Sequence, residues 1–146
     1  MELLDSEKPI EQEGGKNLAL FGIISFILAA LAGLIMLVGV YKSYSALNTN
    51  GAPDAATLSR GILFIGYSQM VQIPTVILGM VLCLMAFSKN HHKLLGWRIL
   101  LVCNIIIFIS GISNLISLIL AGVMLGHLFT KKQFYFAENT EGYNNN

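Results

Sequence analysis

The chain has 146 residues, of which 55% are hydrophobic and 12% are charged, and its formal net charge is +1. A soluble domain carries about 25% charged residues, so this composition argues against a soluble catalytic domain. The near-neutral charge also gives no electrostatic case for nucleic-acid binding, which needs a basic surface.

Three long segments of the chain contain no charged residue. Asp, Glu, Lys and Arg are absent from residues 18–40, 61–87 and 99–129. Each segment exceeds the roughly 20 residues that a helix needs to cross the hydrocarbon core, and only a helix satisfies its backbone within one such segment. The sequence therefore predicts an all-α integral membrane protein, with three transmembrane helices at about residues 18–40, 61–87 and 96–126 of a membrane domain spanning residues 18–129.

The two ends of the chain are polar. Residues 1–17 contain Pro9 and a glycine pair and cannot bury a core, so we expect a disordered N-terminal tail. The acidic residues in this tail, and the length of the apolar segment after it, disfavour a cleaved signal peptide. Residues 130–146 form a second polar tail.

The expected loops contain residues typical of turns and helix starts. Residues 48–53 are rich in turn formers and should end the first helix. Asp54 then has the position of an N-cap for the second helix, which Pro74 should kink. The third apolar segment is longer than one crossing needs, and tilt, a bend near Gly111 or an end projecting into water would absorb the excess.

Lysine and arginine are nearly balanced between the two sides of a three-helix topology. The side with the N-terminus and the second loop has five such residues, and the opposite side has four. Because cytoplasmic loops carry the excess of these residues, the N-terminus is expected in the cytoplasm.

Polar residues of the second helix recur at helical spacing and share one face. Two interpretations remain open: the stripe lines a pore, or it bonds helices together, as polar side chains do in lipid. The candidate pore-lining residues are Ser68, Gln69, Gln72 and Thr75.

Small and polar residues of the other two helices also follow helical spacing, which is typical of helix-packing surfaces. On the first helix these residues are Gly22, Ser25, Ala29 and Gly33, and on the third they are Ser110, Asn114 and Ser117.

No catalytic, metal or cofactor motif is evident. Cys83 and Cys103 lie inside apolar segments and are expected to be small buried hydrophobes. His91, His92 and His127 lie at helix ends or in a loop, where Zn²⁺ would need further ligands. The sequence therefore predicts no enzyme, no metal and no cofactor.

Residues 39–62 read GVYKSYSALNTNGAPDAATLSRGI. This stretch resembles the loop between the last two membrane helices of the MotA/TolQ/ExbB proton-channel family. Eight residues of this chain fall at matching positions of the family motif, namely Gly39, Tyr44, Ala46, Leu47, Asp54, Leu58, Gly61 and Ile62. The family's threonine pair is replaced by Ser68 and Gln69.

The chain also departs from the family pattern. Met36 stands where the family has a pore-lining threonine, and Pro74 comes one helical turn early. The family's preceding helix and large cytoplasmic domain are absent, and a third apolar segment follows. The resemblance covers about a third of the chain.

The resemblance implies a subunit of an ion-driven complex in the inner (plasma) membrane, with its N-terminus in the cytoplasm. It further implies a homo-oligomer in the lipid bilayer around a single-helix partner that carries the titratable aspartate, which this chain lacks at mid-membrane. The alternative is a structural or assembly subunit of a larger membrane complex that conducts nothing.

Overall fold

The computed structural model describes residues 8–48 and 54–136, except for the side chains of residues 8–13 and 113. Its regular structure is entirely helical in these residues, which confirms the all-α prediction. The elements are α1 (Lys8–Leu47), α2 (Ala55–Ser88), α3 (Trp97–Ser110), α4 (Leu115–Thr130) and α5 (Lys132–Phe136), with 3-10 turns at His92–Leu95 and Gly111–Ser113.

Two helices are long and apolar enough to cross a membrane, namely α1 over Gly14–Leu47 and α2 over Ala55–Ser88. At about 1.5 Å per residue, the 40 residues of α1 extend over about 60 Å and the 34 residues of α2 over about 51 Å. Both exceed the hydrocarbon core, which is about 30 Å thick. Pro74 lies inside α2 without interrupting it.

The single third helix expected at residues 96–126 is wrong. The chain leaves the helix at Ser110, makes a 3-10 turn over Gly111–Ser113 and starts α4 at Leu115. Helices of 14 and 16 residues reach only about 21 and 24 Å, less than the hydrocarbon core. Asn114 has an extended backbone, and its Oδ1 accepts from the Ile116 N–H at 3.1 Å, so it caps α4.

The expected tails are also partly helical. Residues 8–17 continue α1 instead of forming a disordered segment, because a helix already nucleated in the apolar segment extends at little cost. Gly15 is buried at the His91 ring, which occupies the space that a side chain at residue 15 would need. In the other tail, residues 132–136 form α5, whose Tyr135 is buried. Residues 1–7, 49–53 and 137–146 lie outside the described part of the chain.

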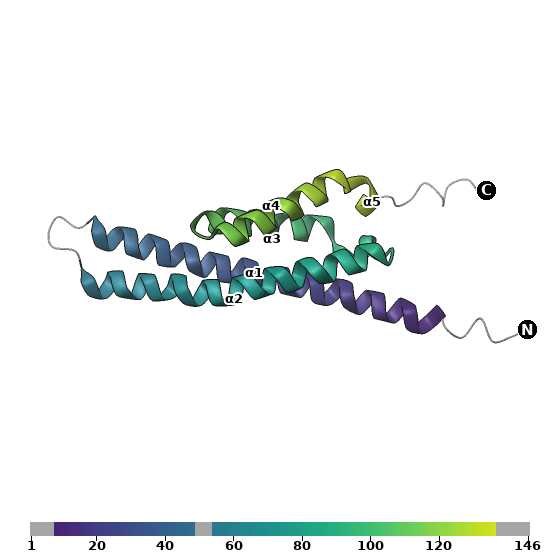
Figure 1. Cartoon of the computed structure of the whole chain (residues 1–146), viewed down its shortest axis with the longest axis horizontal. Helices are drawn as coiled ribbons and strands as arrows, with labels where there is room; N and C mark the ends of the chain where they lie inside the picture. The colour runs from purple at the N-terminus through teal and green to yellow at the C-terminus, as the bar shows by residue number, and fades with distance from the viewer. Residues whose placement is uncertain (1–7, 49–53, 137–146) are drawn as a thin grey trace, which may run out of the picture.

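Helices α1 and α2 form an antiparallel hairpin (Figure 1). Gly22 of α1 lies at Cys83 of α2, whereas Gly39, further along α1, lies at Gly61, near the start of α2. Small residues at these crossings let the two backbones approach closely.

Helices α3 and α4 form a second antiparallel hairpin that lies along one side of the first (Figure 1). Trp97, at the start of α3, donates from Nε1 to the Leu128 carbonyl near the end of α4, at 2.9 Å. At the other end of this hairpin, Gly111 lies against Leu118. This second hairpin covers only the part of α1 and α2 nearest the described chain ends, and the opposite part extends beyond it.

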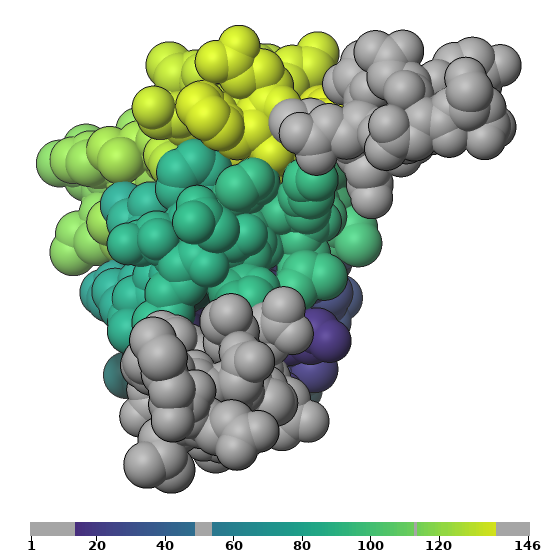
Figure 2. All heavy atoms as spheres, turned by 90° about the vertical axis from the view of Figure 1, so that its right-hand side faces the viewer, coloured from purple at the N-terminus to yellow at the C-terminus, as the bar shows by residue number. Residues whose placement is uncertain are grey.

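The end of α2 is tied to the start of the second hairpin. The His91 N–H donates to the Ala86 carbonyl and the Asn90 N–H to Phe87, with Asn90 in the left-handed region at φ 60°. This is the Schellman pattern that ends helices. Figure 2, which faces the end where the termini lie, shows the last part of α2 between α1 and the pair α4–α5. Both described termini and the segment from residue 89 to 96 therefore lie at one end of the molecule.

Replacing Asn114 tests the capped turn. Asn114→Ala should cost about 0.5–2 kcal/mol, because the Ile116 N–H loses its acceptor. Asn114→Ser keeps a side-chain acceptor, so its thermal unfolding midpoint should be close to that of the original protein. The measurement is the thermal unfolding midpoint in detergent, and equal midpoints for Asn114→Ala and the parent would contradict the cap.

Candidate functional site

Three helices meet at a buried polar contact. Gln72 of α2 is fully buried and donates from Nε2 to the Ser110 Oγ, at 2.8 Å, at the end of α3. Gly33 of α1 lies directly against this pair: a Cβ there would be 2.6 Å from the Ser110 Oγ and 2.9 Å from the Gln72 Nε2. The glycine therefore leaves the space that the hydrogen bond occupies.

Two buried polar side chains of α3, Ser110 and Asn104, also donate hydrogen bonds within their own helix. The Ser110 hydroxyl donates to the Ile107 carbonyl at 3.1 Å, and the Asn104 amide donates to Leu100 at 2.8 Å. The Gln72 Oε1 and Asn104 Oδ1 are buried and accept no hydrogen bond from any described residue.

The four candidate pore-lining residues of α2 face the interior of the chain only in part. Ser68 is buried and donates to the Phe64 carbonyl at 2.6 Å. Thr75 is half-buried and donates to Val71 at 2.7 Å. Gln69 is also half-buried. Of the four residues, Gln72 is the one whose side chain bonds to another helix.

The small residues expected to pack on α1 are buried against neighbouring helices. Gly22, Ser25, Ala29 and Gly33 are all buried. Gly22 lies at Cys83, and Ser25 lies at Gly79 of α2. Both cysteines are free and buried.

The residues of the resembling motif lie at the far end of the α1–α2 hairpin. A Cβ on Gly39 would be 2.9 Å from the Gly61 carbonyl oxygen, and the converse distance is also 2.9 Å. Asp54 caps α2 by accepting from the Ala56 and Thr57 N–H groups, as the sequence predicts. The Thr57 hydroxyl also donates to its carboxylate and holds the pKa of Asp54 below its ordinary value. Leu58 is half-buried in the first turn.

The three residues expected on one face of the third helix belong to different elements. Ser110 ends α3, Asn114 caps α4, and Ser117 is buried in α4. The helical spacing that connected them does not apply, because the turn separates them. Gly111 and Asn114 within an apolar segment were the available signals, since glycine and asparagine favour turns and caps.

An aromatic cluster at the end near the described termini was not anticipated from the sequence. Phe87 at the end of α2 contacts the rings of His92, His127, Phe134 and Tyr135, at centroid distances of 5.4, 4.8, 6.2 and 5.8 Å. Burial raises the pKa of the Tyr135 phenol, which therefore stays neutral. The half-buried side chains of His92 and His127 thus pack against aromatic rings, and the described residues contain no group of three or more side chains that could hold a metal ion.

Comparisons with known proteins found no relative: no family model, curated protein or solved structure matches the chain. The inference of function therefore depends on the geometry.

The crowding at residue 33 gives a direct test of the junction. Gly33→Ala should destabilise the protein by about 1–3 kcal/mol, because the added methyl displaces Ser110 or Gln72. Gly66→Ala on α2 is the matched control, since a Cβ there meets nothing within 4 Å and alanine favours a helix by about 1 kcal/mol. Thermal unfolding in detergent would measure both, and equal effects would contradict the junction.

Proposed function

We propose that this chain is a non-conducting structural subunit of a membrane protein complex. The single observation that supports it best is the hydrogen bond of Gln72 to Ser110 across Gly33. Through this hydrogen bond Gln72, the most buried polar side chain among the candidate pore-lining residues, joins α2 to α3 of the same chain. Hydrogen bonds and small residues are what hold helices together in lipid.

The outer surface supports a location in lipid. Large apolar and aromatic side chains are exposed along both long helices, and they include Tyr41 at 72%, Tyr67 at 68% and Met70 at 75%. Soluble monomers rarely expose contiguous apolar patches larger than a few hundred Å². Part of this surface, on the half of the hairpin beyond α3 and α4, is available to the helices of a partner.

The two-hairpin architecture supports a definite orientation. When only α1 and α2 cross, both termini and the segment 89–96 share one side, unlike in the three-crossing topology. That side carries Lys8, Lys16, Lys89, Lys93, Arg98, Lys131 and Lys132, and the other carries Lys42 and Arg60. By the positive-inside rule, both termini lie in the cytoplasm of a plasma membrane.

Cysteine labelling tests this orientation. In a variant without Cys83 and Cys103, a cysteine at Ser45 should react with an impermeant reagent added outside intact cells. Cysteines at Lys89 and Gln133 should react only after the cells are opened. A cysteine at Gln133 labelled from outside, together with one at Lys89 labelled only from inside, would restore three crossings and contradict the proposal.

Ion flux tests the non-conducting role. Vesicles containing the pure protein should show no proton flux above protein-free vesicles, and Gln72→Leu should leave this baseline unchanged. The same substitution should lower the unfolding free energy by about 1–3 kcal/mol, because the junction loses its hydrogen bond. Gln69→Leu, at a half-buried position of the same helix, is the control and should have the smaller effect.

A subunit of a MotA/TolQ/ExbB-like ion-driven complex is the second candidate. It is favoured by the contact of Gly39 with Gly61 and by the cap at Asp54, which give the motif residues a joint role at one end of the hairpin. Here copies of the chain would surround a partner helix carrying an aspartate. Proton flux that needs this partner and disappears in Gln72→Leu but not in Gln69→Leu would favour this candidate.

A further inference from the structure

We propose that the α4–α5 turn and Trp97 form a binding site for the headgroup of an anionic phospholipid. This inference depends on the membrane location in the proposed function and adds a specific lipid partner to it. The site is a pocket of about 570 Å³ lined by Phe129, Thr130, Lys132, Gln133 and Phe136.

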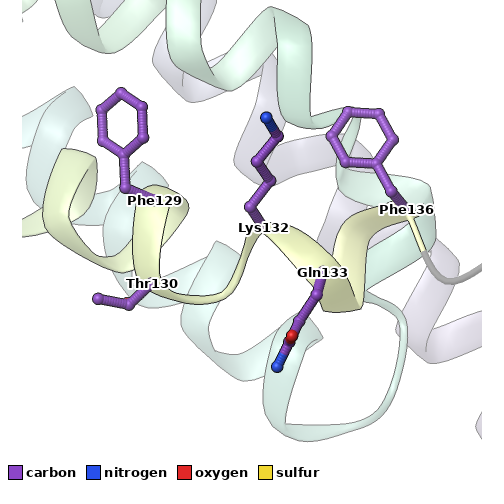
Figure 3. A pocket seen from close by; sticks show the side chains of 5 residues that line it. All are labelled: Phe129, Thr130, Lys132, Gln133 and Phe136. Carbon is purple, nitrogen blue, oxygen red and sulfur yellow. The ribbon is translucent and has the colours of Figure 1, made fainter.

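The turn arranges a cation between two aromatic rings. Figure 3 shows the Lys132 side chain between those of Phe129 and Phe136, all three extending to the same side of the ribbon, with Thr130 and Gln133 on the other. Phe129 and Phe136 are 61% and 46% exposed. An exposed cation flanked by exposed apolar rings suits a ligand with a charged head and apolar tails.

Trp97 packs beside this surface. Its Nε1 donates to the Leu128 carbonyl, and its ring lies 5.3 Å from Phe136 and 6.4 Å from Phe129, between centroids. The Lys132 ammonium lies 5.2 Å from the Trp97 ring centroid. Tryptophan is enriched at the level of lipid headgroups, where an apolar ring and a polar N–H are both accommodated.

The charge of the segments that contain the pocket and Trp97 favours an anionic headgroup. Residues 89–98 and 127–136 contain Lys89, Lys93, Arg98, Lys131 and Lys132 and no aspartate or glutamate. Each lysine near an anionic membrane surface strengthens binding about fivefold, and basic pockets beside membrane helices bind acidic headgroups.

The single tryptophan of the chain makes the site directly measurable. The protein is reconstituted into vesicles of phosphatidylcholine and phosphatidylglycerol, in which one or the other lipid carries bromines near the headgroup end of its chains. Bromine quenches tryptophan fluorescence on contact, so the ratio of quenching gives the preference of the Trp97 site. We expect brominated phosphatidylglycerol to be preferred about fivefold in low salt, and less in 1 M salt, which screens charge.

Matched variants identify the responsible cation. Lys132→Gln should bring the ratio of quenching by the two brominated lipids close to one, which means no preference. Lys132→Arg should retain the preference for phosphatidylglycerol. Lys42→Gln is the control, because Lys42 also lies over a ring, 4.9 Å from Phe64, but belongs to the opposite end of the hairpin. The control should leave the preference unchanged, and a preference that survives in Lys132→Gln would overturn the assignment.

The two proposals fail in different ways. Equal quenching by both brominated lipids in the original protein would remove the headgroup site while leaving the membrane location intact. Absence of quenching by either lipid would contradict the membrane location itself.

Discussion

The space beside Gly33 determines how the two hairpins fit together. A fully buried glutamine amide in apolar surroundings is costly unless it is hydrogen-bonded, and Gln72 finds its acceptor only where α3 ends, at Ser110. Any side chain on residue 33 would occupy the position of that bond. The level at which the second hairpin turns back is thereby fixed relative to α1 and α2.

The long hairpin is held together by close approach of α1 and α2 at glycines, beside buried large side chains such as Phe26. Gly22, Gly39, Gly61 and Gly79 each lie at the facing helix, two from α1 and two from α2. In lipid the apolar exterior provides no hydrophobic drive for helix association, so van der Waals contact of this kind contributes more. The glycines also fix the register, because each meets a definite partner, such as Cys83 for Gly22.

The sequence predicted the parts of the fold that depend on hydrophobicity and local capping. The two long helices, the cap at Asp54 and the inward face of α2 follow from charge-free length, a residue preference and helical spacing. A bend near Gly111 was among the expectations, but the full reversal of the chain at Gly111–Ser113 did not follow, because hydrophobicity continues through these residues and placed both halves in one helix.

The candidate site was less accessible from the sequence. Gln72 and Ser110 were both identified, but as members of separate stripes, because their bond joins residues 38 positions apart and requires the second hairpin to fold back. The cluster around Phe87 was missed for the same reason: its rings come from α2, the segment after it, α4 and α5.

Because the second hairpin turns back at Gly111, the proposed topology with two crossings has a consequence for biosynthesis. In the proposed orientation, the translocated polar chain is the short connection from the end of α1 to the start of α2, with Asp54 as its charged residue, together with the adjoining helix ends that carry Lys42 and Arg60. All of the chain after Ser88 enters from the side on which it was synthesised. Insertion then requires one helical pair to pass into the bilayer, and the second hairpin can dock afterwards against a surface that the first pair has already formed.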